Sequence, residues 1–168
     1  MPLAFPAHAA DMSQIRQPGW EAMCLRNDQP INFCRSFSGP KQISHTPELA
    51  AAISRINDGV NSEYRFQSDS RSYGVSDYWT VPTGGTADCE DYVLAKMLAL
   101  QNAGYPVSAT VILIGRLNNG RWHSTLGVQT SSGLVMMDSL RPAQTASLGF
   151  RAAYYLEMSN AGGWRAAR

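Results

Sequence analysis

The chain has 168 residues, of which 44% are hydrophobic and 16% are charged, and its formal net charge is +1. This composition excludes an intrinsically disordered chain, and the balanced charge gives no electrostatic reason to expect a nucleic acid as partner. No apolar run is long enough to span a membrane, and the length predicts one domain over residues 11–168 that can bury its own core.

The first ten residues have the pattern that ends a secretory signal peptide. Ala7-His8-Ala9 is a small-x-small sequence of the kind that signal peptidases cleave. The alternative is an Ala- and Pro-rich terminus without a targeting role. We expect residues 1–10 to be a signal-peptide remnant outside the fold, and hence a periplasmic or secreted protein.

Three cysteines divide into a close pair, Cys24 and Cys34, and the distant Cys89. We interpret residues 11–40, which are rich in Pro, Gly, Asn and Ser, as an irregular arm anchored by Trp20. In an oxidising compartment Cys24 and Cys34 would pair and leave Cys89 as a free thiol. The alternative is that all three are reduced and that Cys89 is a buried structural residue.

A first helix is expected over residues 47–61. Thr46 is a good N-cap, Pro47 suits the first helical position, and apolar residues recur at helical spacing. Residues 62–87 carry many Ser, Tyr, Gly and Asp residues without a clear period. They predict a long loop with a short helical turn, and a loop of this length in a compact domain usually has a function.

A second helix is expected over residues 89–102. Asp88 is a good N-cap, and Asp91 three residues later completes a box-like arrangement. Apolar residues cover much of its circumference, so the helix should be substantially buried. Gly104 ends it.

The remaining chain predicts β-structure. Strands are expected over residues 107–117, 122–129, 134–138 and 150–158, and Asn-Gly and Ser-Gly turns separate the first three. Helices followed by an antiparallel meander give an α+β fold.

Cys89 stands where a helix begins, and this position suits a nucleophile. Unpaired N–H groups and the positive end of the helix dipole favour a thiolate, and the same N–H groups can hold an oxyanion. A base is also needed. His123 on the second strand is the candidate, because His45 precedes a helix in a polar stretch and is expected to be a surface residue.

Asp138, at the end of the third strand, is the candidate to orient His123. The alternative is an aspartate that only caps a turn. A hairpin centred on Ser132 would place residue 141 opposite His123, so this pairing needs a bulge or a turn nearer Thr130.

Three carboxylates, Asp88, Glu90 and Asp91, crowd Cys89. Their charge would raise the pKa of the thiol and oppose its activation. Either Asp88 and Asp91 are used for helix capping, or a bound cation such as calcium cancels the charge.

These residues together resemble the bacterial transglutaminase-like cysteine proteinases, a family of periplasmic proteases that includes enzymes releasing adhesins from the cell surface. The likeness covers roughly residues 18–165. The matching positions are Asn57, Asn61, Asp77-Tyr78-Trp79, Pro82, Gly85 to Tyr92, Lys96, Leu100, Gly104, His123 to Leu126, Gly133 and Asp138.

The resemblance implies a papain-like, transglutaminase-like fold and a Cys89-His123-Asp138 triad. It also implies a calcium ion near the nucleophile, with Asp88 and Glu90 as ligands and Asp91 as a further one. Trp79, or the loop around it, is expected to shape the substrate cleft. The implied partners are a protein substrate, such as a surface adhesin, and a regulatory protein.

Three other functions remain open from the sequence. The same triad would serve another acyl transfer, such as amide hydrolysis or transglutamination, because the first half-reaction is identical. A calcium-dependent binding module could keep the fold without catalysis. Zinc ligation by Cys89, His123 and Asp138 is the least favoured, because no two of these ligands are closely spaced.

Overall fold

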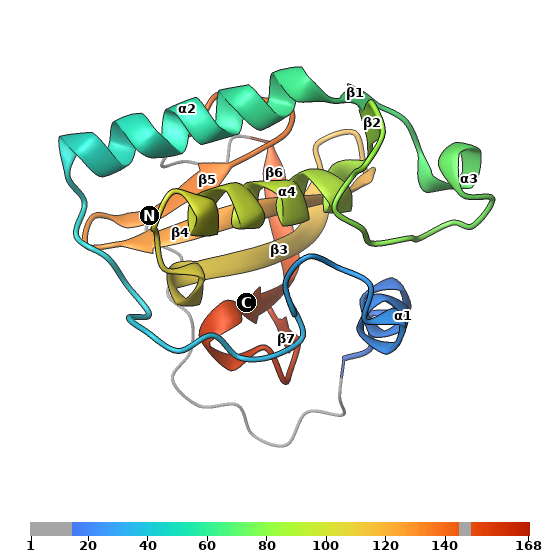
Figure 1. Ribbon diagram of the computed structural model, residues 1–168, viewed down its shortest axis with the longest axis horizontal. Coiled ribbons are helices and arrows are strands. Elements are labelled where there is room, and N and C mark those ends of the chain that lie inside the picture. Colours follow the sequence, from blue (N-terminus) through green and yellow to red (C-terminus); the bar gives the residue numbers. More distant parts are fainter. Residues whose placement is uncertain (1–14, 145–148) are drawn as a thin grey trace.

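A five-stranded antiparallel sheet lies at the centre of the structure, a computed structural model that describes residues 15–144 and 149–168 (Figure 1). The strand order is β5-β4-β3-β6-β7. The strands are β3 Thr110–Leu117, β4 Trp122–Thr130, β5 Gly133–Met137, β6 Phe150–Glu157 and β7 Arg165–Ala166. The signal-peptide prediction for residues 1–10 lies outside the described residues.

Helix α4 (Cys89–Asn102) packs on one face of the sheet, and helix α2 (Pro47–Glu63) packs against α4 (Figure 1). The main core joins fully buried side chains of α4 and of three strands, among them Leu94, Met97, Ile112, Leu126 and Leu156. Burying an aliphatic side chain of this size contributes about 1.5–3 kcal/mol. This packing fixes the N-terminus of α4, and with it Cys89, relative to the sheet.

The α+β prediction is confirmed, and so are both predicted helices. The hydroxyl of Thr46 caps α2 by accepting a hydrogen bond from the Leu49 N–H at 3.1 Å, and α2 continues to Glu63. Helix α4 spans Cys89–Asn102, as predicted.

The structure corrects two expectations for the N-terminal half. The arm is not irregular throughout: Pro18–Arg26 forms helix α1, because Pro18 suits the first turn and Trp20 and Met23 bury one face. The expected loop contains the predicted short helical turn, as helix α3 (Asp69–Ser72), but it also contains a parallel pair of two-residue strands that was not expected. These strands are β1 Arg65–Phe66 and β2 Thr86–Ala87.

The strand expected over residues 107–117 begins three residues late, because Val107–Ala109 forms a 3-10 turn named η1. A second such turn, η2 (Met158–Asn160), follows β6. Within the described ranges, no helix is both long and apolar enough to cross a lipid bilayer.

A disulfide joins Cys24 of α1 to Cys34, with 5.8 Å between their Cα atoms. It lies beside a cluster of three tryptophans, Trp20, Trp79 and Trp164, whose rings meet edge to face with centroids 5.3–6.1 Å apart. These contacts attach α1 to the segment before β2 and to the C-terminal residues.

Removing the disulfide should lower the free energy of unfolding. Closing a loop of about 10 residues is expected to contribute about 2–3 kcal/mol through the unfolded-state entropy. The measurement is urea unfolding of the Cys24→Ser/Cys34→Ser double variant, whose stability should not respond to reductant. Equal stability of the double variant and the oxidised wild type would contradict the estimate.

Candidate active site

Cys89 is the first residue of α4, and the sequence before it explains why the helix begins there. Asp88 accepts a hydrogen bond from the Asp91 N–H, and the Asp91 carboxylate accepts one from the Asp88 N–H, at 3.5 and 3.4 Å. This reciprocal capping box satisfies two backbone donors and confirms the predicted box-like arrangement. Cys89 is partly buried, and among the described cysteines it is the free one.

The immediate surroundings of the thiol are negative. Burial raises the pKa of the Cys89 thiol well above its ordinary value, and the nearby Glu90 and Asp88 carboxylates raise it further. The Cys89 thiol donates a hydrogen bond to the Glu90 carboxylate, with 3.1 Å between Sγ and Oε2. The backbone N–H of Ser124 on β4 lies against the sulfur and opposes this shift only in part. With its pKa raised in this way, the Cys89 thiol keeps its proton.

His123 and Asp138 form a buried pair. Nε2 of His123 lies 3.0 and 3.1 Å from the two Asp138 oxygens, and the side chains are 5% and 9% exposed. Burial alone would raise the pKa of Asp138, but the hydrogen bond and charge of His123, with the Leu140 N–H, bring it below its ordinary value. The ionised carboxylate can only accept, so Nε2 carries the proton and Nδ1 is left as the basic nitrogen.

The pair forms without the bulge or the shifted turn that the sequence suggested. The β4–β5 hairpin turns at Ser131 and Ser132, and Leu126 lies opposite Met137. One further step of this register places Asp138 beside Thr125, diagonal to His123 on the same face of the sheet. Diagonal neighbours are within reach of long side chains, so the imidazole spans the gap.

The structure brings together two of the three predicted catalytic residues directly. Within residues 15–144 and 149–168, no hydrogen bond joins Cys89 Sγ to the His123 ring. The sulfur instead contacts the Ser124 N–H, next along β4 from His123. Contacts between catalytic groups are often long before substrate binds, so this arrangement is compatible with a Cys-His pair.

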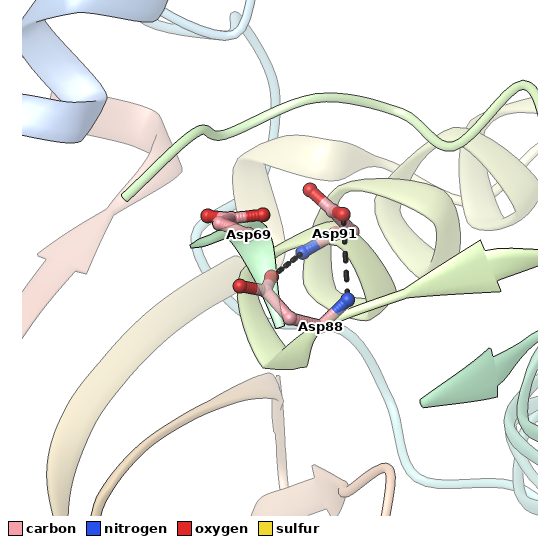
Figure 2. Close-up of side chains that lie close together, drawn as sticks. All are labelled: Asp69, Asp88 and Asp91. Carbon is pink, nitrogen blue, oxygen red and sulfur yellow. Dashed lines mark hydrogen bonds between the residues drawn. The ribbon is translucent and has the colours of Figure 1, made fainter. Parts of the chain in front are cut away.

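Three buried aspartates, Asp69, Asp88 and Asp91, gather beside the start of α4 (Figure 2). One carboxylate oxygen from each lies within 4.8 Å of the others. Burial and the neighbouring Glu90, with smaller contributions from Asp91 and Asp69, raise the pKa of Asp88 to about 10, and burial is the main cause that raises the pKa of Asp91 to about 7. Burial also raises the pKa of Asp69. The positive charge of a bound cation would favour the ionised form of these carboxylates.

One buried carboxylate oxygen of the cluster has no hydrogen-bond partner within the described residues. Oδ1 of Asp69 is buried and accepts no hydrogen bond within the described residues, whereas Oδ2 accepts one from the Tyr78 N–H. Oδ1 of Asp91 accepts a hydrogen bond from the Thr80 N–H at 3.1 Å. An unpartnered buried oxygen among carboxylates fits a hard cation such as Ca²⁺, which takes oxygen ligands.

Sequence reasoning missed Asp69, which lies 19 residues before Asp88 in the segment interpreted as loop. No local spacing links the two; the parallel pairing of β1 with β2 brings the strand before Asp69 beside the strand before Asp88. Glu90, a predicted metal ligand, lies outside this three-aspartate group and contacts the thiol.

Trp79 has a structural position. Its side chain is 1% exposed and packs between Trp20 and Trp164, so its ring lines no surface. The part of Trp79, or of the loop around it, in a substrate cleft stays a prediction, and with the ring buried it falls to the loop. Burial of the ring anchors the loop whose Tyr78 and Thr80 N–H groups hold the aspartates.

This chain matches one family of known proteins. The profile described as bacterial transglutaminase-like cysteine proteinase matches residues 11–159. The fold is similar to that of LapG from Legionella pneumophila in a structure described as calcium-bound, with 22% identity and a TM-score of 0.60 over 74% of this chain and 71% of that one. A LapG structure described as EGTA-treated gives 23% identity and a TM-score of 0.59, with 74% and 70% covered. No curated protein sequence matches the chain.

In the absence of a bound cation, the free energy of unfolding should fall as the pH rises from about 4 towards 7 and beyond. The unfolded aspartates titrate near pH 4, whereas the folded ones keep protons up to about 7 at Asp91 and about 10 at Asp88. The folded state then binds more protons than the unfolded state, so raising the pH destabilises it.

The measurement is urea unfolding in chelator at about pH 5 and about pH 8 for the wild type and for Asp88→Asn. Asparagine keeps the helix cap and removes the charge, so the variant should lose less stability than the wild type between the two pH values. Equal losses would show that the cluster does not titrate in this way.

Proposed function

The chain belongs to the bacterial transglutaminase-like cysteine proteinases, and on that premise we propose that Cys89, His123 and Asp138 form its catalytic triad. The chain is thus a cysteine protease, and its substrate is a protein. The observation that carries the triad is the buried His123–Asp138 pair at 3.0 Å, one residue from the Ser124 N–H that touches Cys89 Sγ.

Each residue has a defined role in peptide hydrolysis. Nδ1 of His123 takes the thiol proton, and the Cys89 thiolate attacks the carbonyl carbon of the scissile bond. The unpaired N–H groups at the start of α4 stabilise the oxyanion. The imidazolium then protonates the leaving amine, and a water molecule, deprotonated by His123, hydrolyses the thioester and frees the thiol. Asp138 keeps His123 in the tautomer with Nδ1 free.

A calcium ion held by Asp69, Asp88 and Asp91 would reduce the negative charge around Cys89. When bound, it supplies positive charge that offsets the aspartates beside Cys89 and favours loss of the thiol proton. The unpartnered oxygen of Asp69 and the resistance of Asp88 to ionisation support this proposal. The LapG structures described as calcium-bound and EGTA-treated support it as well. Glu90 remains a predicted ligand from the family resemblance.

We place the enzyme outside the cytoplasm, in the periplasm, where its substrate would be a cell-envelope or surface protein such as an adhesin. The Cys24–Cys34 disulfide supports this placement, since disulfides persist in oxidising compartments. A regulatory protein partner stays a prediction from the family resemblance.

Proteolysis should depend on Cys89 and His123. We expect purified wild-type protein, incubated with calcium and a bacterial cell-envelope extract, to create new protein N-termini that mass spectrometry identifies. Cys89→Ala and His123→Ala should lose this activity by at least about 1,000-fold, since triad members act as a unit. His45→Ala is the matched control and should keep full activity, because within the described residues the His45 ring has a hydrogen-bond contact with the Thr130 hydroxyl alone, and the bond to Ser131 comes from the backbone N–H.

The same N-termini produced by Cys89→Ala would contradict the nucleophile. Amide hydrolysis or crosslinking without new N-termini would favour another acyl transferase. Calcium-dependent capture of an envelope protein that is not cleaved, with no loss in Cys89→Ala, would favour a binding module.

Calcium affinity should depend on Asp69, the residue that the sequence did not single out. Asp69→Asn keeps a side-chain oxygen for the Tyr78 N–H and removes one charge, so we expect its affinity to fall by about 10- to 100-fold in isothermal titration calorimetry. Asp58→Asn, at an exposed position of α2, is the matched control and should bind as the wild type does. Equal affinities for Asp69→Asn and the wild type would place the ion elsewhere.

A further inference from the structure

Asp138 lies just beyond the sheet that it helps to complete. Strand β5 ends at Met137, where a turn of residues 137–141 leaves the sheet before Gln144 forms an isolated bridge with Met136. The strand ladder therefore does not fix the Asp138 backbone. Its carboxylate nonetheless meets His123 Nε2 at 3.0 Å, while the same oxygen accepts a hydrogen bond from the Leu140 N–H at 2.8 Å.

Three side chains from two helices hold this turn by its carbonyl groups. Nζ of Lys96 on α4 donates to the Met137 carbonyl at 3.1 Å. On α2, the side-chain amide of Asn61 donates to the Asp138 carbonyl, and that of Asn57 to the Arg141 carbonyl, both at 2.9 Å. Asn57 and Asn61 are four residues apart, so they lie on one face of α2 and reach the same turn.

Lys96 has an unusual environment for a lysine. Its side chain is 0% exposed, among the apolar residues of α4, and lysines are almost never fully buried unless they are paired. Burial lowers the pKa of Lys96 to about 7, and the Asp138 and Asp58 carboxylates oppose this shift. The amine also lies 5.8 Å from the centre of the Tyr92 ring.

An apolar side chain of the same length would fill the space of Lys96 without this desolvation cost. Packing therefore does not account for the residue, whereas its hydrogen bond to Met137 and its charge near Asp138 do. Asn57 is also 0% exposed, and the amide oxygens of Asn57 and Asn61 have no partner within the described residues. Both asparagines thus serve the turn through their N–H groups.

We propose that Lys96, Asn61 and Asn57 are positioning residues that hold the turn of residues 137–141, so that the Asp138 carboxylate stays aligned with His123. They touch neither Cys89 nor the aspartate cluster in any described contact. Their effect on catalysis passes through the orientation of the His123 ring. This inference rests on the proposed triad and deepens it.

The test compares Lys96→Met with Leu100→Ala. Methionine preserves length and apolar packing but removes the donor and the charge. Leu100 is 2% exposed on the same helix, so Leu100→Ala destabilises the core without touching the turn. The main readout is the ring N–H proton of His123 in the NMR spectrum, assigned by its absence in His123→Ala. The second is the rate of Cys89 alkylation by iodoacetamide with calcium present.

In Lys96→Met, the ring proton should exchange with solvent at least about tenfold faster, because its acceptor is no longer held. Cys89 alkylation should slow by about tenfold. Leu100→Ala should lower the thermal midpoint and leave both readouts unchanged. Asn61→Ala should change both readouts as Lys96→Met does. Because Asn61 is only partly buried, this variant should fold, and it replaces Lys96→Met in the test if Lys96→Met does not fold.

An unchanged ring proton and alkylation rate in folded Lys96→Met or Asn61→Ala would overturn the inference. Failure of the proposed function has a different outcome. In that case the ring proton would still depend on Lys96, but Cys89 alkylation in the wild-type background would be indifferent to His123→Ala.

Discussion

The accumulation of negative charge around the start of α4 is the constraint on which the rest of the site depends. A helix N-terminus favours an anion, and the capping box that starts α4 requires Asp88 and Asp91 at that position. Asp69 and Glu90 add two further carboxylates beside them. Burial, together with the Glu90 and Asp88 carboxylates, holds the proton on Cys89, so the fold that presents the nucleophile also suppresses it. The proposed cation among the aspartates would relieve this conflict, and on that proposal the enzyme would be active only when the ion is bound.

The N-terminal arm supports this acidic site through a chain of contacts. The disulfide fixes α1, and α1 holds the loop before β2: the Gly19 N–H donates to Asp77, and the Arg26 guanidinium donates to the Trp79 carbonyl at 2.6 Å. The N–H groups of Tyr78 and Thr80 on this loop then bind Asp69 and Asp91. The arm thus positions the aspartates proposed as metal ligands, while the sheet positions His123, the proposed base, and its partner Asp138.

Local signals in the sequence predicted most of the fold. The caps at Thr46 and Asp88 and the apolar periodicity located α2 and α4, and β-rich segments between turn residues located four strands. Helix α1 was missed, because Pro, Gly and Asn around a short apolar face indicate irregular structure. Its burial against Trp79 and Trp164 stabilises it through contacts that are distant in the sequence.

The site was only partly predictable for the same reason. His123 and Asp138 were identified by residue type and strand position, but their diagonal contact depends on the register of one hairpin. Asp69 carries no local motif and reaches the cluster through the β1–β2 pairing. Trp79 matched a family position, yet its ring is needed in the core. Local sequence patterns do not reveal contacts that depend on how strands pair in the folded protein.

The central claim is that a cation at the aspartate cluster switches Cys89 from thiol to thiolate. The most direct measurement is a pH titration of thiolate ultraviolet absorbance, taken as the difference between the wild type and Cys89→Ala, with calcium and with chelator. The account predicts a pKa for Cys89 well above its ordinary value in chelator, as the structure indicates, and a marked fall when calcium is added. Identical titration curves in the two conditions would contradict it.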